Sequence, residues 1–378
     1  MTKRIFQLNL QKHFGGGEVY THFLCQALDR LDIPHTLITS DDTNCWDTLS
    51  FNKTKLEKSA ANISSILNIV GKEPSIFITH GNVAAEWREA IKSAGHKLIG
   101  IAHMPLYGRN PDSYLGYDGV IGVSQYVVNS LKDSNTSNVY ENPWYGVASL
   151  ERNVKPHQQL VANSKYDWDL RKGRDRLFSW LEPLYLPLKK QQEWHKKEGI
   201  TVGIVSRITP IKQFPLMFEH IAKALADVPN LNIEIIGSGG YASVRDLKKA
   251  LEPIKDKVRF WGFQNDINQV YGNLDFLLTG LPEKEALGLN VIEAQALGLP
   301  VLAVNAMPFT ETVLDEKSGF LFTDPREDNG QHLAKILTDI QPDKDKYPEP
   351  LKHAEHLHRF SLDSFTKRVE QSLEWLSN

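Results

Sequence analysis

The stretch Thr201-Val-Gly-Ile-Val-Ser-Arg207 is a short apolar run that ends in a basic loop, and an apolar-periodic segment follows at 213–226. The same order opens the chain, where an apolar run at 5–10 precedes a segment with helical periodicity at 18–31. Strands that alternate with helices over such long connections form parallel sheets with right-handed crossovers. Because this strand–helix pattern begins a second time at Thr201, the sequence predicts an α/β protein with two doubly wound, Rossmann-like units in tandem.

The remaining apolar runs extend both units. Strands are expected at 35–39, 75–79, 97–102, 119–123, 232–236, 257–261, 276–278 and 300–304, and helices at 241–251, 266–272, 290–297, 331–337 and 362–376. Between 143 and 198 the alternation gives way to a polar stretch that contains tryptophan. We expect one domain at 1–197 with an insertion at about 150–190, a second at 198–350, and a helical segment at 351–378 that returns to the first.

Composition narrows the class of protein. A chain of 378 residues exceeds what one hydrophobic core usually supports, and a formal charge of −3 gives no overall reason to bind nucleic acid. The only cysteines, Cys25 and Cys45, favour neither a disulfide framework nor a zinc site. No stretch approaches the roughly 20 apolar residues of a membrane span. We expect a cytoplasmic protein that can rest on the inner face of a membrane.

A glycine run joins the first strand to the first helix. It is Phe14-Gly-Gly-Gly-Glu18, and its glycines let a ligand approach the backbone where the helix start offers unpaired N–H groups. This arrangement suits a diphosphate. An ordinary turn between a strand and a helix is the alternative.

Two cations follow the first strand of the second half. Arg207 and Lys212 stand five positions apart in one loop, where they can converge on a single anion. The alternative is a solvated basic loop.

A third motif, Glu285-Ala-Leu-Gly-Leu-Asn-Val-Ile-Glu293, places carboxylates on both sides of a helix start near Asn290. Carboxylates accept hydrogen bonds from paired hydroxyls of a sugar or ribose. The alternative is a glutamate near a helix start that is favoured only by the helix dipole.

Together these motifs resemble the retaining GT-B glycosyltransferases of family 4, the glycosyl transferases group 1. The E-x7-E spacing of Glu285 and Glu293 is typical of that family. The other motifs occur in the family's order: 15–18, 101–105, 122–124, Arg207 with Lys212, 235–239, and 360–365 near the end. The resemblance implies two domains that face each other across a cleft, an acceptor-binding one at 1–197 and a nucleotide-sugar-binding one at 198–350.

The resemblance also assigns roles. Catalytic residues would be His103 beside the reacting sugar, Arg207 and Lys212 on the diphosphate in place of a metal, and Glu285 on the transferred sugar. Donor-binding residues would be Gly16, Gly17, Arg207, Lys212, Gly237, Gly288, Leu289 and Glu293, the last on the ribose. No metal ligand is expected, because protein cations and helix N-termini can stabilise the departing phosphate directly.

The implied reaction is transfer of a hexosyl or N-acetylhexosaminyl group, with retention, to a glycan, lipid-linked or other hydroxyl acceptor. The implied setting is bacterial cell-surface polysaccharide or glycoconjugate synthesis, with no cofactor and with UDP preferred to GDP in the donor. Leu287 and Ala286 replace the family's usual Phe and Gly, which alters the donor-sugar pocket. The alternatives are a nucleotide-sugar hydrolase or epimerase of the same fold, and a catalytically silent partner of another transferase.

The insertion carries its own pattern. Arg171, Lys172, Arg174 and Arg176 lie close to Trp168, Phe178, Trp180 and Leu181. Such a mixture fits a peripheral contact with a membrane interface. A partly buried amphipathic linker is the alternative.

Overall fold

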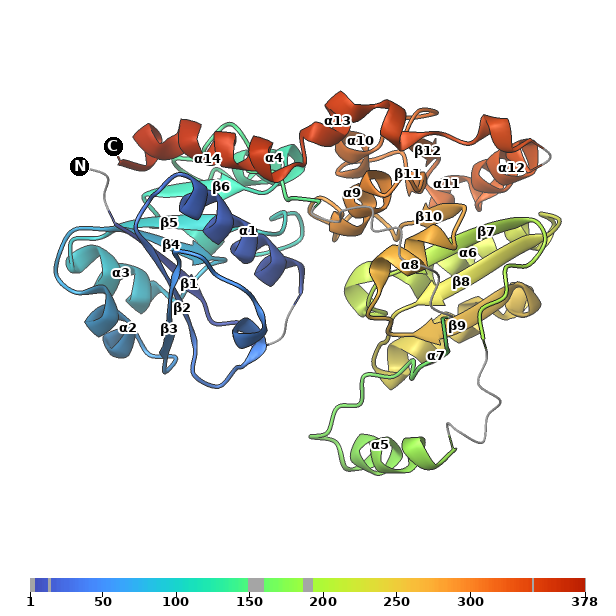
Figure 1. Cartoon of the computed structure of the whole chain (residues 1–378), viewed down its shortest axis with the longest axis horizontal. Coiled ribbons are helices and arrows are strands. Elements are labelled where there is room, and N and C mark those ends of the chain that lie inside the picture. Colours follow the sequence, from blue (N-terminus) through green and yellow to red (C-terminus); the bar gives the residue numbers. More distant parts are fainter. Residues whose placement is uncertain (1–3, 13–14, 149–159, 186–192, 342, 378) are drawn as a thin grey trace. The chain divides into compact units, whose positions relative to one another are not determined.

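A computed structural model describes residues 4–12, 15–148, 160–185, 193–341 and 343–377. The chain divides into two compact units: unit 1 comprises Met1–Ser149 with His358–Asn378, and unit 2 comprises Leu150–Leu357. Each unit is built on its own six-stranded sheet (Figure 1). The expected domain limits at 1–197, 198–350 and 351–378 stay a prediction.

The sheet of unit 1 is parallel throughout, in the order β3-β2-β1-β4-β5-β6. Its strands are β1 (Ile5–Asn9), β2 (His35–Ser40), β3 (Lys55–Ser59), β4 (Ile76–His80), β5 (Lys97–Ala102) and β6 (Gly119–Gly122). The chain runs outward from β1 to β3 and then resumes on the other side of β1 with β4. The order of strands therefore reverses between β1 and β4.

Helices cover this sheet. They are α1 (Gly16–Arg30), α2 (Ile63–Val70), α3 (Ala85–Ser93), α4 (Gln125–Asp133) and α14 (Leu362–Ser377), with 3-10 turns η1 (Cys45–Thr48) and η2 (Pro111–Tyr114). The C-terminal helix α14 packs within unit 1 through Phe365, which is fully buried. Its ring centroid lies 5.4 Å from that of Tyr20 and 6.2 Å from that of Trp144.

The sheet of unit 2 is also parallel, in the order β12-β11-β10-β7-β8-β9. Its strands are β7 (Ile200–Val205), β8 (Leu231–Ile236), β9 (Val258–Gly262), β10 (Phe276–Leu278), β11 (Val301–Val304) and β12 (Gly319–Phe322). Here the order reverses between β7 and β10. A single core of buried aliphatic and aromatic side chains fills the space between this sheet and its helices.

The helices of unit 2 include α6 (Phe214–Ala226), α7 (Tyr241–Ala250), α8 (Ile267–Gly272), α9 (Leu289–Ala296), α10 (Phe309–Thr312), α11 (Pro325–Asp328) and α12 (Gln331–Ile340). Short 3-10 turns occupy η3 (Pro210–Lys212), η4 (Glu252–Lys257), η5 (Lys344–Lys346) and η6 (Pro350–Lys352). Helix α13 (Ala354–His358) leads to α14. In the described part of the chain, no helix combines the length and apolarity needed to cross a bilayer.

The insertion packs against unit 2, where its first part adds to the edge of the sheet. Asn163 N–H donates to the Trp261 carbonyl at 2.9 Å, and Tyr166 forms a parallel bridge with Gly239. Helix α5 (Gly173–Tyr185) follows, drawn apart from the sheet of unit 2 in Figure 1. Of the expected insertion at about 150–190, residues 150–159 and 186–190 lie outside the described residues.

The prediction of two doubly wound α/β units is confirmed, but some elements were missed. Strand β3, with the sequence Lys-Leu-Glu-Lys-Ser, has a largely polar and partly exposed edge position, so it lacks an apolar run. Strand β12, which forms one edge of the sheet of unit 2, was also not predicted. The expected start of a helix at residue 213 is wrong, because Gln213 has φ 54° in the left-handed region and α6 begins at Phe214.

Candidate active site

The loops at the reversal of strand order in unit 2 carry the sequence-predicted charges. In open parallel sheets, ligands bind at the carboxyl ends of the strands where the order reverses. Arg207 and Lys212 follow β7, and Glu285 follows β10, so they lie on the two sides of that point. Gly237 follows β8 at the same edge.

Lys212 and Glu285 meet directly. Lys212 Nζ donates to Glu285 Oε2 at 2.5 Å, although the residues are 73 positions apart. Their side chains are only 29% and 18% exposed, which strengthens the interaction over that of a fully solvated pair. Gly280 makes room for this loop, since a Cβ there would lie 2.3 Å from the Lys212 carbonyl oxygen.

Arg207 is fixed through its backbone neighbours, while its side chain is exposed. Ser206 N–H donates to the Ile236 carbonyl at 3.0 Å. Gly237 has φ 134°, and a Cβ on it would lie 2.0 Å from the Ser206 carbonyl oxygen, so only glycine fits. Within the described residues, no hydrogen bond or ion pair joins the Arg207 guanidinium to Lys212 or Glu285.

Helix α9 begins at the same edge. Gly288 caps it with φ 83°, and Leu289 is its first residue. Asn290 Nδ2 donates to the Val205 carbonyl at 3.2 Å, which ties the helix start to the end of β7. The first N–H groups of a helix have no intrahelical acceptor and carry partial positive charge. The start of α9 therefore offers anion-binding groups beside the Lys212–Glu285 pair.

Glu293 lies one turn further along α9. Burial raises the pKa of its carboxyl to about 7. The carboxylate in turn contributes, after burial, to a raised pKa of the Tyr271 hydroxyl. A carboxyl with this pKa changes its charge around neutral pH.

In unit 1, the glycine run opens α1 beside β1. Gly15 is the N-cap, Gly16 and Gly17 are the first residues of the helix, and Phe14 lies outside the described residues. A Cβ on Gly17 would meet no atom within 4 Å. The backbone is therefore open to a ligand at this point.

His103 follows β5 and contacts His80, which ends β4 at the reversal point of unit 1. His103 Nε2 lies 3.1 Å from His80 Nδ1, and His80 Nε2 lies 3.0 Å from Gln7 Oε1. Burial lowers the pKa of His103 to about 4 and that of His80 well below its usual range. Both rings are therefore neutral at physiological pH.

These contacts assign the ring protons. His80 Nε2–H donates to the Gln7 side-chain oxygen, so His80 Nδ1 is an acceptor and accepts a hydrogen bond from His103 Nε2–H. His103 Nδ1 then carries a lone pair that can accept a hydrogen bond. Thr21 Oγ1 lies 3.0 Å from His80 Nδ1 and accepts from Asn9 Nδ2 at 2.9 Å, extending the network to α1.

Several site residues were missed from the sequence. His80 closes an apolar run just before Gly81, which has φ 111°, so its place at a strand end was detectable. The Asp167 carboxylate of the insertion accepts a hydrogen bond from the Ser238 hydroxyl in the loop after β8, a contact that no sequence pattern indicated. Gly239 N–H donates to the Lys165 carbonyl at 3.1 Å in the same region. The insertion therefore borders the predicted nucleotide edge.

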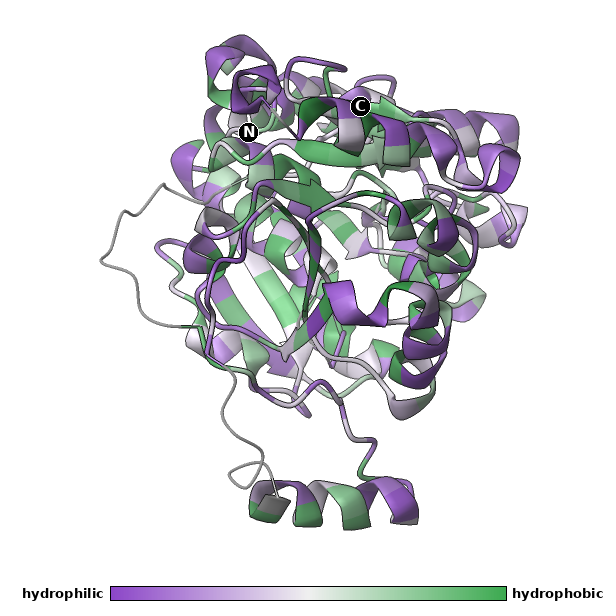
Figure 2. Ribbon diagram, turned by 90° about the vertical axis from the view of Figure 1, so that its right-hand side faces the viewer, coloured by the Kyte–Doolittle hydropathy of each residue, from purple (hydrophilic) through white to green (hydrophobic). Residues whose placement is uncertain are grey.

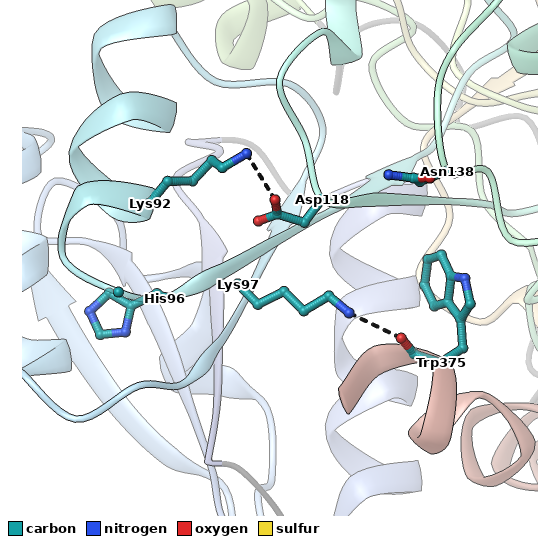
Figure 3. A pocket seen from close by; sticks show the side chains of 7 residues that line it. Lys92, His96, Lys97, Asp118, Asn138 and Trp375 are labelled. Carbon is teal, nitrogen blue, oxygen red and sulfur yellow. Dashed lines mark hydrogen bonds and ion pairs between the residues drawn. The ribbon is translucent and has the colours of Figure 1, made fainter. Parts of the chain in front are cut away.

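A cavity of about 590 Å³ in unit 1 lies elsewhere, at the amino ends of β5 and β6 (Figure 3). Lys92 Nζ pairs with Asp118 Oδ1 at 2.8 Å, and Lys97 Nζ donates to the Trp375 carbonyl at 3.1 Å. A Cβ on Gly119 would lie 2.5 Å from the Trp375 ring, so this tryptophan packs against the sheet. These contacts attach α14 to unit 1, and the cavity is at the opposite edge from His80 and His103.

The charged side chains at the candidate site are two cations, Arg207 and Lys212, and carboxylates that are not clustered. Among the residues that the structure describes, no group of three or more His, Cys, Asp or Glu side chains is arranged to hold a metal ion. Metal independence itself stays a prediction, to be tested by chelation.

Comparisons with known proteins concern the family and the fold. Residues 187–352 match the family described as glycosyl transferases group 1. The chain is 21% identical over 280 residues to the GtfA subunit of the UDP-N-acetylglucosamine–peptide N-acetylglucosaminyltransferase of Streptococcus agalactiae, covering 67% of this chain and 54% of that protein. It is 33% identical over 145 residues to an uncharacterised glycosyltransferase of Haemophilus influenzae, covering 38% and 39%.

The crystal structure of HepE from Anabaena in complex with UDP is similar over 98% of this chain and 99% of that one, with a TM-score of 0.70 and 18% identity. The fold is therefore the GT-B fold of two doubly wound units. Residues 187–352, somewhat less than half of the chain, are thus similar to the glycosyl transferases group 1 family. It spans about half or less of the length of the two curated relatives.

Proposed function

We propose that this chain is a retaining, metal-independent glycosyltransferase that moves a sugar from a nucleoside-diphosphate sugar to a hydroxyl acceptor. The contact between Lys212 and Glu285 at the start of α9 carries this proposal. At this point, where the strand order of the unit 2 sheet reverses, a cation, a carboxylate and helix N–H groups lie together, so a diphosphate and a sugar can bind side by side.

The roles follow from the chemistry of bond cleavage. Negative charge grows on the departing phosphate, and Arg207, Lys212 and the N–H groups of Gly288 and Leu289 would stabilise it. Glu285 would accept hydrogen bonds from the transferred sugar while orienting Lys212. The leaving phosphate would take the acceptor's proton on the face from which it departs, so that configuration is retained.

Glu293 supports the nucleotide assignment. Burying a carboxyl so that its pKa rises to about 7 costs stability, and such costs concentrate at functional sites. Two ribose hydroxyls would supply the hydrogen bonds that favour the ionised form. Gly237 would allow the nucleotide to approach the backbone.

Unit 1 carries the other residues with predicted roles. Gly16 and Gly17 offer amide groups at the start of α1. His103 Nδ1, left as an acceptor by the His80 contact, would take a hydrogen bond from a hydroxyl of the reacting sugar. This neutral ring can orient the sugar without adding positive charge to the site.

The donor is proposed to be a UDP-sugar carrying a hexosyl or N-acetylhexosaminyl group. The name of the Streptococcus agalactiae relative includes UDP-N-acetylglucosamine, and HepE was solved with UDP. We further propose a glycan or lipid-linked acceptor in bacterial cell-surface polysaccharide or glycoconjugate synthesis, at the cytoplasmic face of the membrane.

The test is release of nucleoside diphosphate by the purified chain from a panel of UDP- and GDP-sugars, in excess chelator, with and without glycan acceptors. We expect UDP release that an acceptor accelerates, with the sugar joined to the acceptor in the donor's anomeric configuration. Equal release of free sugar with and without acceptor would indicate a hydrolase. No release with any donor, together with no nucleotide binding, would indicate a silent partner.

A further inference from the structure

Helix α5 of unit 2 exposes its apolar side chains and buries its acidic ones. Leu177, Trp180 and Leu184 are 54%, 69% and 61% exposed, whereas Asp175 and Glu182 are only 3% and 7% exposed. Residues spaced by three and four positions share one helix face, so the three apolar residues form a stripe. A helix that packs on its own core has the opposite arrangement. Figure 2 shows apolar and polar residues intermixed along this helix.

Specific contacts hold α5 in this orientation. Glu182 Oε1 accepts from Ser164 Oγ at 2.7 Å, and Glu182 Oε2 accepts from Trp168 Nε1. Trp168 also stacks on Phe178, with ring centroids 5.9 Å apart. A rotation of α5 that buried the stripe against unit 2 would break these contacts. The exposure of the stripe is therefore built into the local structure.

The exposed charges around the stripe are basic. Side chains of Arg171, Lys172 and Arg174 are 91%, 68% and 58% exposed. The side chains alone of their acidic partners Asp169 and Asp175 are only 24% and 5% exposed, so the carboxylates lie beneath the cations. An apolar stripe with tryptophan beside outward cations matches an interface between anionic headgroups and acyl chains.

We propose that α5 is an interfacial helix that docks unit 2 onto an anionic membrane surface. Leu177, Trp180 and Leu184 enter the boundary between headgroups and acyl chains, while Arg171 and Lys172 contact lipid phosphates. The contact is peripheral, since α5 is 13 residues long and lies in the plane of the surface. The proposal uses none of the residues assigned to the donor site, so it stands whether or not the transferase function holds.

Co-sedimentation of the full chain with vesicles tests the proposal. We expect binding to vesicles of phosphatidylcholine mixed with phosphatidylglycerol, with a blue shift of tryptophan emission, and much weaker binding to phosphatidylcholine alone. The triple variant Leu177→Ser, Trp180→Ser, Leu184→Ser is expected to lower the partition coefficient at least about 100-fold, because it removes the inserted apolar area. The double variant Arg171→Gln, Lys172→Gln is expected to lower it about 25-fold on anionic vesicles, at roughly fivefold per charge.

Leu115→Ser is the matched control, because Leu115 is 69% exposed and lies outside α5. It should bind vesicles like the unaltered chain. All variants should keep their melting temperature and any donor turnover in solution, since the altered side chains are exposed. Equal binding by the triple variant and the control would overturn the proposal. So would equal binding to neutral and anionic vesicles, or a dimer in solution that only the triple variant abolishes.

Discussion

Replacing Glu293 with glutamine should stabilise the protein at neutral and higher pH. Burial raises the pKa of this carboxyl from 4.5 to about 7. Between those values the folded state binds more protons than the unfolded state, so the free energy of unfolding falls as pH rises through this window. At 1.36 kcal/mol per pKa unit, the difference corresponds to at most about 3 kcal/mol above pH 7. Glutamine does not titrate and removes this cost.

Urea unfolding of the full chain and of Glu293→Gln between pH 4.5 and 8 measures the effect. We expect the two proteins to have similar stability near pH 4.5, with the variant gaining up to about 3 kcal/mol by pH 8. UDP binding by the variant should weaken over the same range, because the ionised carboxylate no longer accepts the ribose hydroxyls. A stability difference that is independent of pH, or a variant that is less stable at pH 8, would refute the reasoning.

Three further changes separate function from stability. Gly17→Ala should raise the free energy of unfolding by about 0.5–1 kcal/mol, because alanine favours a helix over glycine and the new methyl group would meet no atom within 4 Å. The same methyl group should slow turnover by obstructing the donor. The control is Gly272→Ala, at another helical glycine with open space, which should leave turnover unchanged. His103→Phe should lower kcat about tenfold for the loss of one hydrogen bond, and unaltered steady-state kinetics would remove His103 from the site. Phe365→Ala should destabilise unit 1 by about 3–5 kcal/mol in chemical unfolding, because this side chain is fully buried between Tyr20 and Trp144. A loss below about 1 kcal/mol would mean that α14 adds little to the stability of the unit.

The sequence predicted the parts of the fold that depend on local pattern. The apolar run at 200–205 is a central strand buried on both faces, and this makes it easy to recognise. Strand β3 escaped because an edge strand can be polar without loss of stability. The start of α6 was misplaced because no residue pattern indicates that Gln213 adopts a left-handed conformation.

For the candidate site, the sequence located the loops but not the contacts. Arg207, Lys212 and Glu285 were predicted to act together, yet the pairing of Lys212 with Glu285 depends on β10 lying beside β7. That neighbour relation follows from strand order, which a single sequence does not specify. The link between His80 and His103 likewise requires adjacent strands β4 and β5.

The central claim is that Lys212, at the reversal of strand order in unit 2, binds a nucleoside diphosphate without a metal ion. Isothermal titration of UDP into the full chain in excess chelator tests it most directly, with Lys212→Met as the variant and Lys196→Met as its control. Lys196 is a second ion-paired lysine of unit 2, 2.9 Å from Asp275. We predict that UDP binds the unaltered chain and the control equally, and binds Lys212→Met with a loss of about 1.5–3 kcal/mol. Binding that requires added Mg²⁺ or Mn²⁺, or equal affinity in all three proteins, would contradict the account.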